Sequence, residues 1–244
     1  MFSRRKFIQA GTFTALGTTV LGCAGNGQED TSETKTSSRI RHNPIGVSTY
    51  SFWQFNGPKE NVPIETCIDH AAAMGFDGIE LLLVQMASEE KSYLHKLKKQ
   101  AFHSGLDLCG FSTHQGFLNP DKEYRDENIR LTKHQIELAY TLGIPTMRLN
   151  TGRWGTSESF DHLMENRGIE PAIEGYTEED GFVWVIDSIS RCLPKAEECG
   201  VVLGLENHWG LGRTAAGVHR IVEEINSPWL KVTLDTGNFL EDSY

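Results

Sequence analysis

The sequence predicts an α/β fold, a (β/α)8 TIM barrel of which about six of the eight βα units lie within the 244 residues. Three observations predict it. Short apolar segments alternate with helical patterns from residue 45 onward, no glycine-rich phosphate loop follows an early strand, and polar side chains stand where the strands end. Alternating strands and helices indicate a parallel sheet with helical crossovers. We therefore assign residues 45–244 to one barrel domain.

The predicted strands are apolar runs of the kind found in sheets that are covered on both faces. In order along the chain they are residues 45–52, 78–84, 106–113, 145–150, 201–206 and 231–235. Three helical patterns, over 64–74, 122–142 and 182–199, each end at a glycine: Gly75, Gly143 and Gly200. Glycine is the usual residue just past the end of a helix.

A closed barrel is favoured over an open doubly wound sheet. An open sheet would be expected to carry a GxGxxG or Walker motif, and neither occurs in the sequence. A barrel places polar residues at the C-terminal ends of many strands. Such residues are Tyr50, Trp53, Glu80, His114, Asn150, Glu206, Asn207, His208 and Asp235.

Six strands would leave two long hydrophobic edges unpaired, which soluble proteins avoid. A barrel of about 250 residues allows roughly 31 residues per unit, and the sequence ends just past the sixth strand. We therefore expect a chain truncated at its C-terminus, with two further βα units beyond it.

The N-terminus predicts export. Residues 3–9 read SRRKFIQ, and paired arginines ahead of a short apolar segment are typical of a twin-arginine signal, here residues 1–22. The run VLGC resembles a lipobox, which would make Cys23 a lipid anchor, and residues 23–44 predict a flexible polar linker. We expect a periplasmic protein or a membrane-anchored lipoprotein. A plain cleaved signal, or a basic N-terminus without meaning, is the alternative.

The composition of the chain limits which classes of molecule it could bind. The formal net charge is −10 and no basic cluster occurs, which argues against nucleic acid. No pair among the five cysteines has CxxC spacing, so no zinc or redox motif is indicated. We expect the partner to be a small molecule, and contact with a membrane to occur only through a lipid at Cys23. Whether the protein forms a homo-oligomer is left open.

Two carboxylates are predicted to meet at the mouth of the barrel. The alternation of side chains along a strand places Glu206 and Asp235 on corresponding faces of adjacent strands. Two carboxylates held together repel each other unless a cation or a shared proton relieves them. Oxygen ligands of this kind suit Mg²⁺, Mn²⁺ or a similar divalent ion.

The motifs GVSTYSF, GIEL, GLENHWG and LDTGN, in this order and on these strands, resemble the xylose isomerase-like TIM-barrel superfamily, and within it the sugar phosphate isomerase/epimerase branch. The resemblance implies that Glu206 and Asp235 bind a divalent metal (Mn²⁺, Mg²⁺, Co²⁺ or Zn²⁺) and that Glu206 is also catalytic. It implies two further ligands, a histidine and a glutamate, beyond Tyr244. Many sugar epimerases carry a substrate-binding histidine where Asn238 stands here, so the substrate can differ.

The predicted function is therefore a metal-dependent isomerase or epimerase, which moves a proton on a sugar or keto-sugar through an enediolate. A dehydratase (lyase) acting on a keto-sugar or cyclitol would use the same metal and base. A carbohydrate-binding surface lipoprotein without activity is the non-enzymatic alternative. The superfamily also contains a DNA-repair endonuclease, against which export and the acidic composition count.

Other side chains near the predicted mouth are candidates for substrate binding, and each could instead have a purely structural role. His114 could contact substrate or metal, or be a hydrogen-bonded loop residue. Glu80 could face the mouth or form a salt bridge, for instance with Arg148. The remaining candidates are Asn207, His208, Asn238, Trp53 and Trp209, the tryptophans otherwise packing over the rim. Histidines within helical patterns (His70, His95, His103, His134 and His219) are predicted to be structural or to face solvent. The long connection over residues 151–180 is interpreted as a lid, or alternatively as a disordered insertion.

Overall fold

The structure is a computed structural model that describes residues 43–53 and 62–238. The predicted signal over residues 1–22, Cys23 and the linker up to residue 42 lie outside these ranges. None of the helices in the described part is long and apolar enough to cross a membrane.

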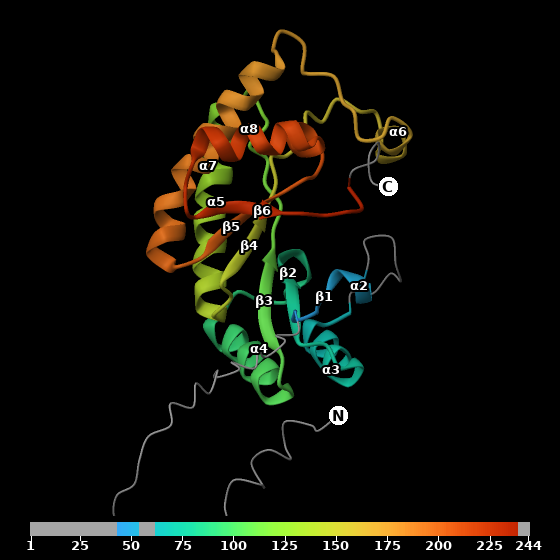
Figure 1. The fold of residues 1–244 in the computed structure, drawn as a ribbon, viewed down its shortest axis with the longest axis vertical. Helices are drawn as coiled ribbons and strands as arrows, with labels where there is room; N and C mark the ends of the chain where they lie inside the picture. Colours follow the sequence, from blue (N-terminus) through green and yellow to red (C-terminus); the bar gives the residue numbers. More distant parts are fainter. Residues whose placement is uncertain (1–42, 54–61, 239–244) are drawn as a thin grey trace, which may run out of the picture. The chain divides into compact units, whose positions relative to one another are not determined.

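The described residues form a sheet of six parallel strands in the order β1 to β6, each strand pairing with the one before it (Figure 1). This sequential order is that of a barrel wall, whereas a doubly wound sheet reverses its strand order at a switch point. The predicted barrel-type α/β fold is therefore confirmed. The strands are β1 Gly46–Ser48, β2 Gly78–Leu82, β3 Asp107–Ser112, β4 Thr146–Leu149, β5 Val202–Glu206 and β6 Leu230–Thr233.

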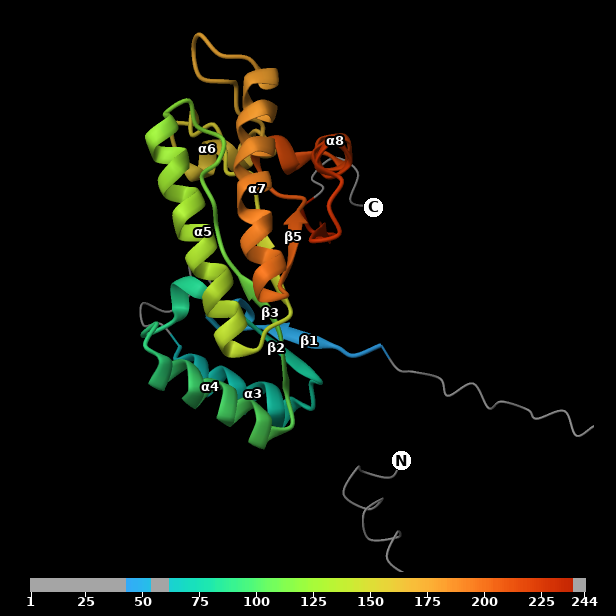
Figure 2. The ribbon, with the colours of Figure 1, turned by 90° about the vertical axis from the view of Figure 1, so that its left-hand side faces the viewer.

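Helices cover the outer face of this sheet, and α4, α5 and α7 pack side by side (Figure 2). The longer ones are α3 Ile64–Met74, α4 Lys91–Ser104, α5 Lys122–Leu142, α7 Glu178–Cys199 and α8 Ala215–Ile225. The predicted bounds of α3 and α5 agree with the structure, and α7 begins four residues earlier than predicted, at a capping box formed by Thr177 and Asp180. Gly75, Gly143 and Gly200 adopt left-handed backbone angles just past the helices, as predicted.

The first strand is shorter than predicted. β1 ends at Ser48, and Tyr50–Trp53 form the short helix α2 instead of continuing the strand to residue 52. The hydrogen bonding changes at Thr49: its amide still donates to the carbonyl of Glu80 on β2 at 2.9 Å, whereas its carbonyl accepts from the Phe52 amide at 3.1 Å, which starts a helical turn. The second strand likewise ends early, at Leu82, and Leu83–Gln85 form a 3-10 turn.

The two faces of the sheet differ in chemistry. Strand register aligns one set of residues against the helices, and all are buried and apolar: Ile79, Leu81, Phe111, Met147, Leu149, Leu203 and Leu205. The inner face, which would line a barrel, carries mostly small or charged residues, with Leu82 as a large apolar one: Ser48, Glu80, Leu82, Gly110, Ser112, Arg148, Gly204, Glu206 and Lys231. Because a sheet alternates its side chains, this pattern brings charges from several strands together.

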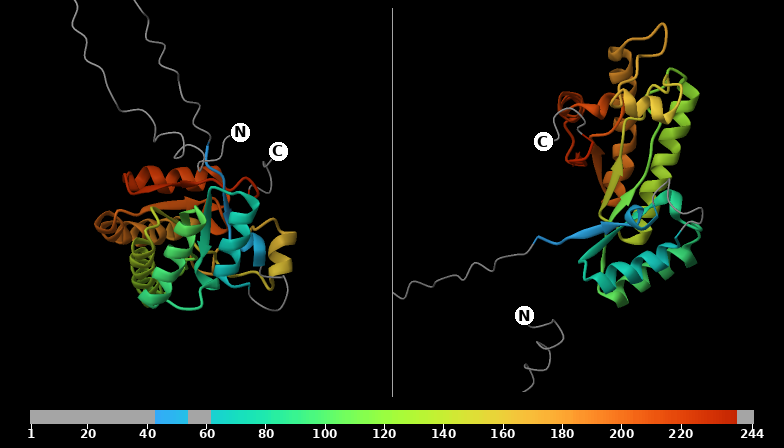
Figure 3. Two further views of the ribbon diagram at one scale, coloured as in Figure 1. Left: turned by 90° about the horizontal axis from the view of Figure 1, so that it is seen from below. Right: turned by 90° about the vertical axis from the view of Figure 1, so that its right-hand side faces the viewer.

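The strands follow one another in chain order from β1 in blue to β6 in red (Figure 3). Within the described residues, β1 and β6 each pair with one strand only. At the β6 edge of the sheet two apolar side chains are exposed: Val232 of β6 is 48% exposed, and Leu234, just after β6, is 65% exposed. Both line an apolar groove of about 320 Å³ against α8.

Candidate functional site

The candidate site lies at the C-terminal ends of β3 to β6. Glu206 is the last residue of β5, and its register partner on β6 is Thr233, two residues before Asp235. The register of the two strands is as predicted, but β6 spans Leu230–Thr233 instead of residues 231–235, so Asp235 lies just beyond the strand. Glu206 is 5% exposed, so its carboxylate is removed from water although it stands where the strand ends.

Glu206 forms a buried ion pair with Arg148. Nη1 of Arg148 donates to Oε2 of Glu206 at 2.8 Å, and Nε2 of His208 lies 3.9 Å from the same oxygen. Burial raises the pKa of Glu206 to about 7; Arg148 acts in the opposite direction, and the charges of Asp235 and Glu80 add to the increase. A carboxyl group with a pKa near neutrality suits proton transfer.

Arg148 therefore pairs with Glu206, and the predicted alternative of a salt bridge to Glu80 is wrong. β4 neighbours β5 directly, whereas β2 is separated from β4 by β3. The side chain of Glu80 instead lies over Gly110 of β3, whose missing Cβ leaves room for it. The negative charge of Glu80 is still close enough to act on Glu206.

The side chain of Asn207 holds Asp235 in place. The Asp235 amide donates to Oδ1 of Asn207 at 2.7 Å, and Nδ2 of Asn207 donates to the Asp235 carbonyl at 2.7 Å. This pair of bonds continues the ladder between β5 and β6 past the last strand residue. Asn238 lies one turn further on, and its amide donates to the same carbonyl at 3.4 Å. That Asn207 and Asn238 contact substrate stays a prediction.

Replacing Asn207 by alanine should lower the free energy of unfolding by about 2 kcal/mol, because the amide of Asp235 loses its partner and the carbonyl of Asp235 keeps only the long bond from the Asn238 amide. Urea denaturation would measure the loss. Asn166→Ala is the matched control, since that side chain makes one exposed hydrogen bond, to the carbonyl of His162. An equal effect of both variants would contradict the assigned role of Asn207.

Two of the predicted histidines come together beside Glu206. The rings of His114 and His208 lie edge to face, with centroids 6.5 Å apart. Burial, reinforced by the charge of Arg148, lowers the pKa of His114 to about 4 and that of His208 to about 3. Both imidazoles are therefore neutral near pH 7, a form that can donate one hydrogen bond and accept another.

The aromatic candidates occupy the rim. The ring of Trp209 packs at a tilt against His208, with centroids 5.5 Å apart, and against Phe160 of the short helix α6 (Phe160–Glu165), also at 5.5 Å. Trp53 is half-buried in α2, after β1. A role of either tryptophan in sugar binding stays a prediction.

The long connection over residues 151–180 is ordered, which rules out the alternative of a disordered insertion. Glu170 fixes it: the side chain is 1% exposed and accepts from the amides of Gly155 and Ser157 at 3.3 and 3.1 Å. Through Phe160 the connection touches Trp209. Its position is compatible with the predicted lid.

Sequence reasoning missed a set of buried polar residues beneath His114. Gln115 joins β3 to β4, because its Nε2 donates to Oγ1 of Thr113 at 2.7 Å and its Oε1 accepts from the amide of Asn150 at 3.0 Å. The signal was present in the sequence. Thr113 ends the strand predicted over 106–113, His114 and Gln115 follow it, and Arg148 is the one charged residue in the strand predicted over 145–150.

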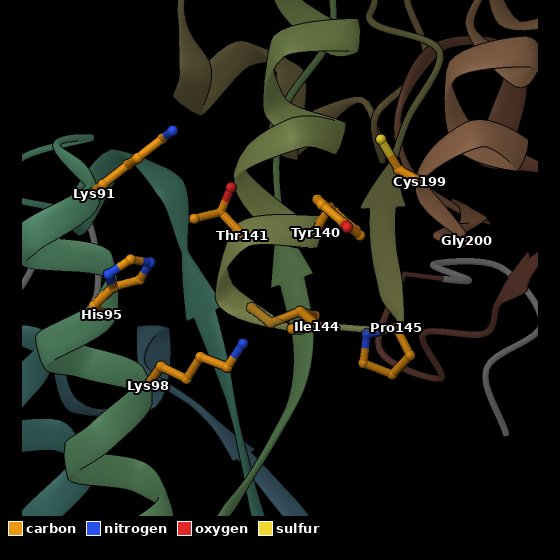
Figure 4. A pocket seen from close by; sticks show the side chains of 10 residues that line it. Lys91, His95, Lys98, Tyr140, Thr141, Ile144, Pro145, Cys199 and Gly200 are labelled. Atoms are coloured by element: carbon orange, nitrogen blue, oxygen red, sulfur yellow. The ribbon is translucent and has the colours of Figure 1, made fainter.

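A cavity of about 650 Å³ lies at the opposite end of the strands. Pro145 and Gly200, which precede β4 and β5, line it (Figure 4). Lys91, His95 and Lys98 face it from α4. No carboxylate lines it, and the N-terminal side of barrel strands is the side that serves stability rather than catalysis. The cavity is therefore no candidate for the active site.

The two carboxylates fit a divalent cation as part of its ligand set. Oε2 of Glu206 is held by Arg148, and Oδ1 of Asp235 accepts from the amide of Gly237 at 2.7 Å. Their other oxygens accept no hydrogen bond from the described residues, and carboxylate oxygens are preferred ligands of hard cations. Within the described ranges no three His, Cys, Asp or Glu residues are grouped so as to hold a metal.

Comparisons with known proteins agree with this fold. A family model described as "Xylose isomerase-like TIM barrel" matches residues 68–244. No curated protein matches the chain in sequence.

Solved structures share the fold at low identity. D-psicose 3-epimerase with D-tagatose, from Clostridium cellulolyticum H10, is 20% identical with a TM-score of 0.64, over 83% of this chain and 67% of that one. 3-keto-D-glucoside 4-epimerase YcjR from E. coli is 17% identical with a TM-score of 0.61, over 82% and 70%. The IOLI protein with a binding zinc atom is 18% identical with a TM-score of 0.62, over 81% and 64%. The chain thus spans about two thirds of the length of these structures.

Proposed function

The chain belongs to the xylose isomerase-like TIM barrel family. We propose that the protein is a divalent-metal-dependent isomerase or epimerase that acts on a sugar or keto-sugar. The observation that carries the proposal is the pair of carboxylates at the mouth. Glu206 ends β5 and Asp235 follows β6, and in each carboxylate one oxygen is held by the protein while the other accepts no hydrogen bond from the described residues.

Glu206 and Asp235 would hold the metal. A divalent cation held there would supply a Lewis acid for a substrate carbonyl. The zinc atom of the IOLI protein, which shares this fold, supports the assignment. The identity of the metal among Mn²⁺, Mg²⁺, Co²⁺ and Zn²⁺ is part of what an experiment has to determine.

The residues of this chain supply the proton chemistry. Glu206 would remove the proton from the carbon next to the carbonyl, because its buried carboxylate lies at the mouth where the substrate would bind. The neutral rings of His114 and His208 would bind hydroxyl groups of the sugar, and Trp209 would cover one face of the site. Two structural relatives are sugar epimerases, which supports a sugar as the substrate class.

Export by the twin-arginine route, with a lipid at Cys23, belongs to the same proposal and is supported by the sequence alone. Cell fractionation tests it, because Cys23→Ala should release a lipid-anchored protein from the membrane fraction. A protein found in the cytoplasm would contradict export.

The protein incubated with Mn²⁺ and a panel of sugars and keto-sugars is expected to produce a mass-neutral conversion, which NMR and mass spectrometry would detect. Loss of water from a substrate would identify the dehydratase alternative. Sugar binding without turnover would favour the carbohydrate-binding alternative. Absence of both metal and sugar binding would overturn the proposal.

A further inference from the structure

Arg148 is a charged residue in a buried position, where an ionised side chain is unusual. It lies in the middle of β4, on the inner face, with Ser112 and Gly204 as register partners. Its side chain is 12% exposed. Burying a guanidinium costs several kcal/mol unless its donors are paired. The hydrogen bonds that Arg148 makes therefore indicate its role.

The guanidinium reaches two candidate site residues on different strands. Nη1 donates to Oε2 of Glu206 at 2.8 Å, after β5, while Nη2 lies 3.1 Å from Nε2 of His114, after β3. Nη2 also donates to the carbonyl of Thr113 at 3.1 Å. One side chain on β4 thereby connects the ends of both neighbouring strands.

Arginine can only donate hydrogen bonds, and this fixes the state of its partners. Nε2 of His114 must accept, so the neutral ring carries its proton on Nδ1. Oε2 of Glu206 likewise accepts from Arg148, and among the described residues Oε1 has no hydrogen-bond donor. The tautomer of a histidine is set in this way by the hydrogen bond that its other nitrogen makes.

The backbone of Arg148 is fixed as well. Oγ1 of Thr113 donates to the carbonyl of Arg148 at 2.8 Å, so the two residues bind each other through two separate bonds. Nε of Arg148, in contrast, is buried without a hydrogen-bond partner in the described residues. The arginine therefore keeps this pose at the cost of one unsatisfied donor, which indicates that its two Nη contacts determine the pose.

We propose that Arg148 is the positioning residue of the site: it holds Glu206 by Oε2, leaving Oε1 for a cation, and fixes His114 with its proton on Nδ1. The first half rests on the proposed function, because it takes Glu206 as a metal ligand. The second half concerns the metal-free protein. Arg148 itself is not assigned a contact with the substrate.

A simpler role, neutralising the charge of Glu206, makes different predictions. A lysine supplies the same charge but lacks the planar fork that bonds two partners on different strands. Electrostatics alone also predicts that removing the positive charge would strengthen cation binding. Positioning predicts weaker binding, because an unheld ligand loses its orientation, by about tenfold or more for a residue of this kind.

The experiment compares wild type with Arg148→Lys and Arg148→Met. Nitrogen-15 NMR of labelled histidines in the metal-free protein should report the Nδ1–H tautomer for His114 in wild type and its loss in both variants. Calorimetry should report Mn²⁺ affinity lowered about tenfold in Arg148→Met. Arg130→Met is the matched control, since Arg130 pairs with Glu127 on the surface of α5 at 2.7 Å.

An unchanged His114 tautomer in both variants, or tighter Mn²⁺ binding in Arg148→Met, would overturn the proposal. If Arg148→Met does not fold, Arg148→Lys gives the tautomer result alone. If wild type binds no Mn²⁺, the proposed metal chemistry fails, while the tautomer of His114 still decides whether Arg148 positions it.

Discussion

Glu206→Gln is expected to reduce turnover by a factor of about 10² to 10⁴, the usual effect of removing a general acid or base. The amide keeps the shape of the side chain and still offers an oxygen to Nη1 of Arg148. It cannot take up a proton, and it is a poorer ligand for a hard cation than a carboxylate. Steady-state kinetics on a sugar that wild type converts, together with calorimetry of Mn²⁺ binding, would measure both effects.

The structure offers a matched control for a buried glutamate. Glu170 is equally enclosed, with its side chain 1% exposed, but it binds backbone amides of the long connection and not the candidate site. Glu170→Gln should leave Mn²⁺ affinity as it is in wild type. Asp235→Asn should weaken Mn²⁺ binding in the same direction as Glu206→Gln. Unchanged metal content and turnover in both site variants would contradict the proposed function.

The parts of the site that follow from local rules could be predicted from the sequence. Side chains alternate along a strand, so the spacing within each strand predicts that Glu206 and Asp235 face the same side. Helix ends were predictable for a similar reason, because a glycine such as Gly143 supplies the left-handed backbone that stops a helix.

The contacts between strands could not be predicted in this way. Arg148 was weighed as a partner of Glu80, but the choice between Glu80 and Glu206 depends on which strands are neighbours and on which rotamer fits over a glycine. The role of Asn207 depends on a backbone segment 28 positions away. Such side-chain bonds to distant backbone leave no periodic trace in the sequence.

Gly210→Ala is expected to cause the largest loss of stability near the site, about 3 to 5 kcal/mol. Gly210 has a φ of +67°, which costs an alanine about 1 kcal/mol or more. An added Cβ would also overlap the carbonyl oxygen of Gly152 and lie 3.0 Å from Oγ1 of Thr151. The loops after β4 and β5 would have to separate, although Thr151 joins them by a bond to the Trp209 carbonyl at 3.2 Å.

Gly155→Ala separates the two causes, because Gly155 has a similar φ of +71° but no atom within 4 Å of its added Cβ. It carries the backbone strain without the overlap, so we expect it to lose only about 1 to 2 kcal/mol. Urea denaturation of both variants would give the difference, which measures how closely the two loops are packed. Equal losses of stability in the two variants would mean that the loops after β4 and β5 can move apart without a measurable free-energy cost. The position of Trp209 and His208 beside Glu206 would then not depend on this contact.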